Sequence, residues 1–333
     1  MTDLEAVSAG TQPGRGRLRR IWPGLRDSLG PIQGKLALAA VIFVICVITA
    51  VGSDVFLTWQ NWRNILEQIA FIGILACGTT LLMVSGGIDL SIGSNVSFSG
   101  ILMGYLIANG VVGLGVAIFL GILAASGIGL VNGLLVSHSR AHPFILTLGM
   151  LTLLQGAALM ISTEPITNFP EKFLDFTFKR PLGVPVVVWF FVGFAIASQL
   201  LLSRTIVGRH LYALGGSETA AALAGVRVRL VKVAFYTLMG FMVGVTATVL
   251  ISTLSAAEAL AGQNYELQAI AAVAVGGTPL QGGRGDIIGT LLGVLLIGVI
   301  GNSLNLLSID PNLQQVLVGA IIVVAVMAQR GRG

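Results

Sequence analysis

The side chains that could do chemistry in this chain are isolated polar groups set inside or at the ends of long apolar segments. They are amides, a hydroxyl and a carboxylate, and we take the following as candidate pathway residues: Asp89, Ser91, Asn95, Asn132, Gln155 and Asn302. Inside a membrane such groups can hydrogen-bond a polar solute on its way across, and they can equally join neighbouring helices. The residue types leave both roles open.

Signatures of catalysis and of ATP hydrolysis are missing from the sequence. It has no HExxH motif and no Cys/His cluster with zinc spacing, and residues 30–36 fall one residue short of a phosphate-binding loop. Carboxylates lie at the ends of apolar runs, which argues against a carrier coupled to protons or sodium ions. We expect no catalytic residue, no metal site and no cofactor bound by this chain.

One polar segment, residues 204–231, contains the pattern of a short capped helix. Ser217 is a good N-cap, Glu218 suits the first turn, and Gly225 is a natural stop after the alanines. A helix this short is marginal alone in water. It can insert into a groove on a cytosolic protein or serve as a linker helix, and both interpretations stay open. The candidate docking residues are Gly215, Gly216, Ser217, Glu218, Ala221, Ala222 and Gly225.

The elements that must position these residues are transmembrane helices. Of the 333 residues 55% are hydrophobic and only 10% are charged, whereas soluble domains average about 25% charged residues. A soluble enzyme and a disordered chain are thereby excluded. Nine uncharged runs remain, and a spanning helix needs roughly 20 residues. The runs are 36–53, 68–88, 90–139, 141–163, 181–203, 233–257, 267–283, 287–309 and 311–329, of which the third holds two helices separated at Asn109-Gly110.

The sequence therefore predicts an all-α polytopic membrane protein with about ten transmembrane helices. Counted along these helices, 15 of the 19 Lys and Arg residues fall on the side of the N-terminus, so both termini are expected in the cytoplasm. The net charge of +5 fits loops that face anionic membrane lipids, and no nucleic-acid partner is expected. A cleaved signal peptide is the alternative for the first run.

The run 267–283 predicts a broken helix. Its apolar part ends at Gly276-Gly277, too early to cross a bilayer, and such interrupted segments are typical of helices that line a transport path. Residues 86–93 and 282–289 share two adjacent glycines, an aspartate and a later glycine, which hints at an internal duplication. Three GxxxG pairs indicate close helix packing within one bundle or a dimerisation face: Gly129/Gly133, Gly240/Gly244 and Gly289/Gly293.

At several of these residues the sequence resembles the permease subunits of ribose-type sugar ABC importers. Residues 86–94, which read GGIDLSIGS, look like that family's signature, and residues 131–136 and 143–149 are similar to its next stretch. Residues 208–218 with Ala221 and Gly225 resemble its cytoplasmic coupling segment. Residues 272–277 and 282–285 complete a resemblance that covers about residues 64–329.

The resemblance implies a multi-pass subunit of the bacterial cytoplasmic membrane that imports a pentose, hexose or similar sugar. Its implied partners are a second permease copy or a paralogue, a cytosolic ATPase that binds ATP and magnesium, and a periplasmic or lipid-anchored sugar-binding protein. The implied domains are a cytoplasmic tail over 1–35, one permease domain over 36–329 with its coupling loop at about 204–231, and a cytoplasmic end over 330–333. A self-sufficient carrier and an ABC permease for branched-chain amino acids are the alternatives.

Overall fold

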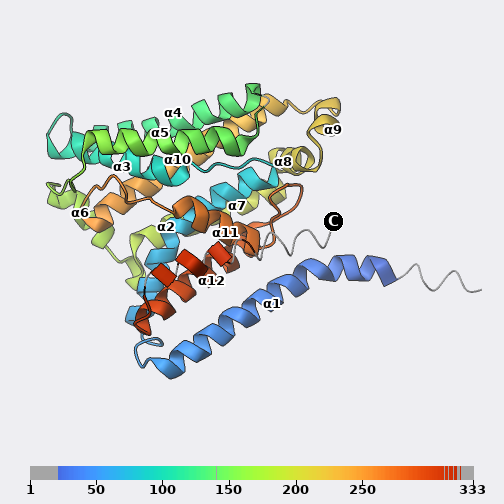
Figure 1. The fold of residues 1–333 in the computed structure, drawn as a ribbon, viewed down its shortest axis with the longest axis horizontal. Coiled ribbons are helices and arrows are strands. Elements are labelled where there is room, and N and C mark those ends of the chain that lie inside the picture. Colours follow the sequence, from blue (N-terminus) through green and yellow to red (C-terminus); the bar gives the residue numbers. More distant parts are fainter. Residues whose placement is uncertain are drawn as a thin grey trace, which may run out of the picture.

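Helices make up this fold. The computed structural model describes residues 22–139 and 141–310, together with 312–313, 315–317, 319–320 and 323. Its elements are α1 (Trp22–Gly52), α2 (Trp59–Val84), α3 (Ile92–Ala108), α4 (Leu114–His138), α5 (Pro143–Ile161), α6 (Glu171–Phe178), the short 3-10 helix η1 (Pro181–Gly183), α7 (Val186–Arg204), α8 (Ile206–Gly216), α9 (Glu218–Leu223), α10 (Val228–Leu254), α11 (Tyr265–Val275) and α12 (Ile287–Leu306). Figure 1 shows them as one bundle, with α6 at one end and α9 at the other.

Within the described residues, seven helices are long and apolar enough to cross a membrane: α1 from Gln33 onward, α2, α4, α5, α7, α10 and α12. Two further apolar helices, α3 and α11, are shorter. The all-α polytopic fold is confirmed, and the predicted separation at Asn109-Gly110 falls between α3 and α4. Most of the expected tenth helix, the predicted end over 330–333 and residues 1–21 lie outside the described residues.

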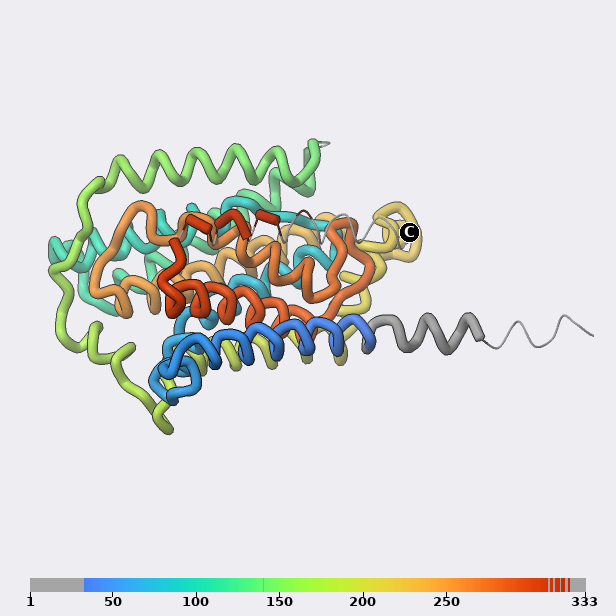
Figure 2. Tube along the Cα trace, turned by 60° about the horizontal axis from the view of Figure 1, so that its bottom comes forward, coloured from blue at the N-terminus to red at the C-terminus, as the bar shows by residue number. Residues whose placement is uncertain are grey.

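The helix α2 occupies the centre of the bundle. Its spanning window is 78% buried, against 11% for α1 and 17% for α5. It packs against α7, α10, α11 and α12, and Figure 2 shows α1 and α5 along opposite sides of the molecule. A helix enclosed in this way is apolar all round. This explains why every residue from Ile69 to Val84 is buried except Ile72, which is half-buried.

Glycines let α4 and α10 approach until their backbones touch. A Cβ atom on Gly129 would overlap the Tyr236 carbonyl oxygen and crowd the backbone of Gly240, and one on Gly240 would overlap Ala125 and Ser126. A Cβ on Gly244 would likewise meet the Cα of Ile122 at 2.7 Å. The GxxxG pairs on these two helices therefore serve packing within the chain, as one of the two interpretations of the sequence holds.

Two helices begin earlier than the apolar runs predict. The start of α1 at Trp22 makes residues 22–35 of the expected loose tail helical, which corrects that prediction. The start of α2 at Trp59 includes the charged Arg63 and Glu67. A helix satisfies its own backbone hydrogen bonds, so it can continue beyond the bilayer into water, where charged side chains are tolerated. Charge therefore marks the edge of the membrane and not the end of the helix.

The segment between α5 and α7 is folded onto the bundle at the end opposite α9. The Ser252 hydroxyl on α10 donates to the Phe173 carbonyl oxygen at 2.6 Å, and the hydroxyls of Ser252 and Thr177 lie 2.9 Å apart. Upstream, Ile166 and Ala257 form a pair of backbone hydrogen bonds. These contacts hold α6 against the last turns of α10.

Candidate functional site

The cytoplasmic helix predicted from the capping pattern is present as α9. The Ser217 hydroxyl accepts a hydrogen bond from the Ala220 amide at 3.2 Å, and Gly225 follows the helix with a φ of +85°. Both are the roles that the sequence predicts for an N-cap and a stop. Sequence reasoning missed α8, which precedes α9 directly and contains Gly215 and Gly216 at its end.

Only one residue of α9 is buried, so most of this helix faces solvent. Ala221 is buried, whereas Ala222 and Leu223 are exposed. The Glu218 carboxylate pairs with the Lys232 ammonium at 2.6 Å, which ties α9 to the first turns of α10. The exposed side of α9 with the following Arg227 is the accessible surface of this segment. Because docking to a cytosolic protein is the role that the sequence predicts for it, we call α9 the docking helix.

Three segments meet beside the docking helix through four glycines, Gly86, Gly215, Gly282 and Gly283, which we call the glycine junction. A Cβ atom on Gly215 would overlap the Val84 carbonyl oxygen and the Gly283 amide nitrogen, and one on Gly282 would lie 2.7 Å from the Gly86 nitrogen. Gly86, Gly282 and Gly283 have positive φ angles, which other residues rarely adopt. The ends of α2 and α8 and the loop after α11 are therefore in direct backbone contact.

Side chains reinforce this cytoplasmic end of the bundle. The Tyr212 hydroxyl on α8 donates to the Gly285 carbonyl oxygen at 2.7 Å. Burial, together with the negative charge of Asp286, raises the pKa of the Tyr212 hydroxyl, so it stays protonated and keeps donating at neutral pH. Asp286 caps α12 at the Gly289 amide and forms an ion pair with Lys35 of α1 at 2.7 Å. The loop after α11 is thus tied to α1, α8 and α12.

The predicted broken helix is α11, which has 11 residues and so spans about 16 Å, roughly half of the bilayer core. It ends at Gly276 and Gly277, the latter with a φ of +101°. A Cβ on Gly276 would overlap the backbone of Gly289 on α12. These glycines therefore allow the chain to leave α11 and run against α12 before it reaches the glycine junction.

Asp89, Ser91 and Asn132 form one buried polar cluster. The Asp89 carboxylate accepts from the Ser91 amide at 2.8 Å and from the Ser91 hydroxyl at 2.7 Å. The Asn132 amide group donates to the Ser91 oxygen at 2.8 Å and to Asp89 at 3.3 Å. The neighbouring Ile88 carbonyl oxygen accepts from the Tyr236 hydroxyl at 2.9 Å. The cluster fixes the turn between α2 and α3 against α4 and α10.

The other candidate pathway amides also have partners within the chain. Asn302 exchanges amide hydrogen bonds with Asn61 at 2.8 and 3.0 Å, and Gln155 donates to the Ala259 carbonyl oxygen at 2.9 Å. Asn95 donates to the Ala125 carbonyl oxygen at 3.3 Å. These bonds match the role of joining helices. A pathway role for these residues stays a prediction.

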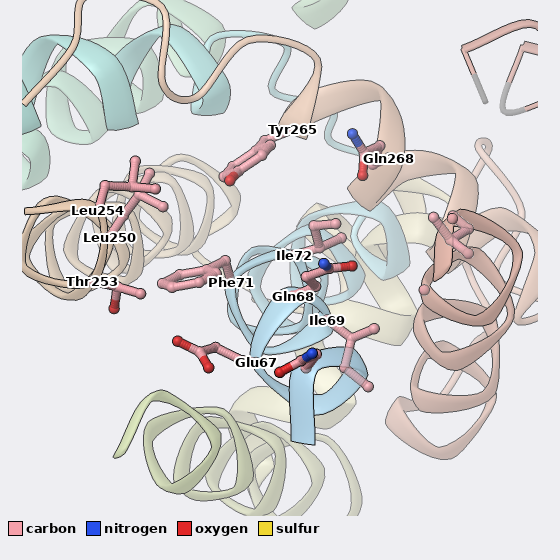
Figure 3. Close-up of a pocket in the computed structure, with 14 residues that line it drawn as sticks. Glu67, Gln68, Ile69, Phe71, Ile72, Leu250, Thr253, Leu254, Tyr265 and Gln268 are labelled. Carbon is pink, nitrogen blue, oxygen red and sulfur yellow. The ribbon is translucent and has the colours of Figure 1, made fainter. Parts of the chain in front are cut away.

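A cavity of about 410 Å³ opens at the opposite end of the bundle from the docking helix. It lies between the outer turns of α2, the last turns of α10, the start of α11 and the second half of α12 (Figure 3). Its lining residues are Asn64, Glu67, Gln68, Ile69, Phe71, Ile72, Leu250, Thr253, Leu254, Tyr265, Gln268, Ile297, Gly298 and Gly301. We call it the outer pocket.

None of the pathway residues chosen from the sequence lines the outer pocket. The sequence does carry a signal for it, because Glu67, Gln68, Tyr265 and Gln268 are polar residues at the edges of two apolar runs. Gln68 and Gln268 lie within the first two residues of their runs, and Glu67 and Tyr265 lie just outside them, so none of the four stands out as a polar residue deep in a span. Helices that extend beyond these runs bring the four side chains to one opening.

A second cavity of about 410 Å³ lies at the cytoplasmic end, beside the glycine junction. Its lining includes Gly86, Gly87, Gly215 and Glu218, so several residues from the two sequence motifs do come together there. The molecule is thus a multi-span helical bundle with one cavity at each end and a docking helix in the cytoplasm. This arrangement is that of a multi-pass membrane protein with an opening at each end.

The chain belongs to a family of ABC-importer permeases, because the family described as "Branched-chain amino acid transport system / permease component" matches residues 61–326. Its relatives include the ribose import permease protein RbsC of Bacillus subtilis, 39% identical over 92% of this chain and 94% of the relative. RbsC of Escherichia coli K12 is 37% identical over 87% of this chain and 92% of the relative. The L-arabinose transport system permease protein AraH of the same strain is 32% identical over 89% of this chain and 90% of the relative.

No solved structure matches this chain. The family and its relatives confirm the resemblance found in the sequence motifs. The protein is therefore a multi-pass permease of the bacterial cytoplasmic membrane, and such permeases work with an ATPase and a solute-binding protein.

Proposed function

We propose that this chain is the translocating subunit of an ABC importer whose cargo is a monosaccharide. Relatives named for ribose, D-allose and L-arabinose transport support this cargo, each over more than four-fifths of the chain. The family description names branched-chain amino acids instead. The two cargoes differ in charge, since an amino acid carries a carboxylate and an ammonium group whereas these sugars are neutral.

The names of these relatives are the observation that favours a sugar, and the composition of the outer pocket agrees with it. Its lining has one carboxylate, three amide side chains, two hydroxyls and the Phe71 ring, and no Lys, Arg or His. The carboxylate of an amino acid is bound most strongly by a cationic side chain, which this lining lacks. The neutral hydroxyl groups of a sugar can make all their hydrogen bonds to amides and a carboxylate, without a cation.

The docking helix is the element through which we expect the ATPase to act. ATP bound with magnesium on that partner would close its two domains and move α9, while this chain supplies no catalytic group. Because Gly215 of α8 touches both Val84 and Gly283, a shift of α8 has to displace α2 and the loop after α11. A second copy of the chain or a paralogue would complete the path. Closed backbone contacts pass on such movements because they cannot be compressed.

A pull-down of the tagged chain from its native membrane in mild detergent is the first test. We expect a protein with two phosphate-binding loops and a sugar-binding protein to co-purify. The complex is then reconstituted in vesicles, and ATP-dependent uptake of labelled ribose, allose, arabinose and leucine is compared. A chain that purifies alone and moves solute without ATP is a self-sufficient carrier, and uptake of leucine alone would make the amino acid the cargo.

A further inference from the structure

The outer pocket combines polar groups without partners and a flat apolar ring. Within the described part of the chain, the side chains of Glu67, Gln68, Tyr265 and Gln268 make no hydrogen bond or ion pair with other residues. Polar side chains in a helical membrane bundle ordinarily bond to a neighbouring helix, as Asn61 and Asn302 do here. Glu67, Tyr265 and Gln268 are half-buried and Gln68 is exposed, so the hydrogen-bonding capacity of these four groups around one cavity is left for a ligand.

We propose that the outer pocket is the membrane site that receives the sugar; this rests on the function proposed above. Glu67, Gln68 and Gln268 bond to the hydroxyl groups of the sugar, and Phe71 and Tyr265 pack against its ring. A carboxylate accepts hydrogen bonds from two hydroxyls, and an amide both donates and accepts. Figure 3 shows the Phe71 ring in the middle of the opening, with Tyr265 and Gln268 on the α11 side and Glu67 on the other.

The size and the charge of the pocket narrow the ligand class. A volume of about 410 Å³ lies at the lower end of the range for small-molecule pockets, which is roughly 300–1,000 Å³, and suits one sugar ring. The single carboxylate and the lack of a basic residue in the lining disfavour sugar phosphates and sugar acids. The pocket is therefore matched to a neutral monosaccharide.

The position of the pocket links it to the docking helix. Glu67, Gln68 and Phe71 lie on the outer half of α2, and the inner end of this same helix forms part of the glycine junction. Movement that α8 imposes on α2 therefore reaches the outer pocket through one continuous helix. Tyr265 and Gln268 lie on α11, whose other end also leads into the glycine junction. The α2 wall and the α11 wall of the pocket are therefore both connected to this junction.

The test uses the assembled transporter in vesicles, with its ATPase and saturating sugar-loaded binding protein, and measures sugar moved per ATP hydrolysed. Under saturation the binding protein no longer limits the rate, so the ratio reports on capture at the membrane site. The variants are Glu67→Gln and Gln268→Ala, with Tyr265→Phe as a change that removes a single oxygen. Glu258→Gln, an exposed carboxylate at the same end and outside the lining, is the matched control.

We expect Glu67→Gln and Gln268→Ala to lower the sugar-to-ATP ratio about tenfold, as the loss of a hydrogen bond to a charged or polar ligand does, while stimulated ATPase activity stays within about twofold. Glu258→Gln keeps both wild-type values. Wild-type ratios in both pocket variants and in Tyr265→Phe would overturn the site while leaving the proposed function intact. A parallel fall in ATPase activity would make these residues structural. Failure of the wild type to carry any monosaccharide would overturn the proposed function and this site together.

Discussion

The amide nitrogen of Gly283 donates a hydrogen bond of 2.9 Å to the carbonyl oxygen of Val84. Val84 is the last residue of α2, where helix carbonyls lack a partner within the helix. The loop after α11 supplies that partner, and Gly215 of α8 packs against both atoms. One backbone contact thus joins the central helix, the broken helix and the segment that leads to the docking helix.

Substitution of Gly215 by alanine tests this junction. The added methyl group meets backbone atoms of Val84 and Gly283, which cannot rotate away, so we expect the free energy of unfolding to fall by about 1–3 kcal/mol and transport to fall with it. Gly216→Ala is the matched control, because its Cβ would have no atom within 4 Å. Thermal unfolding in detergent and vesicle uptake measure both effects. Equal behaviour of the two variants would show that the contact is unimportant.

The docking helix can be uncoupled without unfolding the bundle. In the double variant Glu218→Lys/Gly225→Leu, a carboxylate is reversed to a cation and a leucine is forced to a φ of +85°. Both positions are exposed, and the Glu218–Lys232 ion pair that is lost is a surface pair of small energetic value, so we expect the thermal midpoint to drop only slightly while ATP-driven uptake is lost. Co-purification of the ATPase and uptake are measured side by side. Normal uptake by this variant would contradict the role given to α9.

The buried polar cluster makes a stability prediction. In Asp89→Asn, a new NH₂ group faces the donors of Ser91 and Asn132, and at least one buried hydrogen bond is lost. We expect the variant to be less stable by about 1–3 kcal/mol. Asp54→Asn, at an exposed position between α1 and α2, should stay close to wild type. Thermal melting of both proteins in the same detergent decides the matter, and a wild-type midpoint for Asp89→Asn would refute the prediction.

Two glycines on α4 offer a test of the contact with α10. A methyl group on Gly129 overlaps the Tyr236 carbonyl oxygen and crowds the backbone of Gly240, whereas one on Gly127 has no atom within 4 Å. We expect Gly129→Ala to lower the yield of monodisperse protein and to cost about 1–3 kcal/mol of stability, with Gly127→Ala neutral or slightly stabilising. Size-exclusion chromatography of the fluorescently tagged proteins reports the yield. Similar profiles for the two variants would count against a tight α4–α10 contact.

Local patterns predicted the local features well. The capping residues Ser217 and Gly225 placed α9, and Gly276-Gly277 placed the end of α11, because caps and glycine turns depend on a few neighbouring residues. Apolar runs located the helices but misjudged the starts of α1 and α2. The pathway residues are polar groups inside the runs or at their ends, and the structure shows most of them already bonded to other parts of the chain.

By itself, the sequence determined that the chain is an all-α protein that spans a membrane several times, and it predicts which way the chain faces and which segment meets a cytosolic partner. Composition, the distribution of charge and short motifs carry these properties, and none of them requires knowledge of which helices touch. Only the tertiary structure brought Gly86, Gly215 and Gly283 into one junction, and Glu67, Tyr265 and Gln268 around one cavity. The reason is physical: in an apolar bundle the neighbours of a helix are chosen by close packing of small residues over long sequence distances, and a linear pattern does not encode that choice.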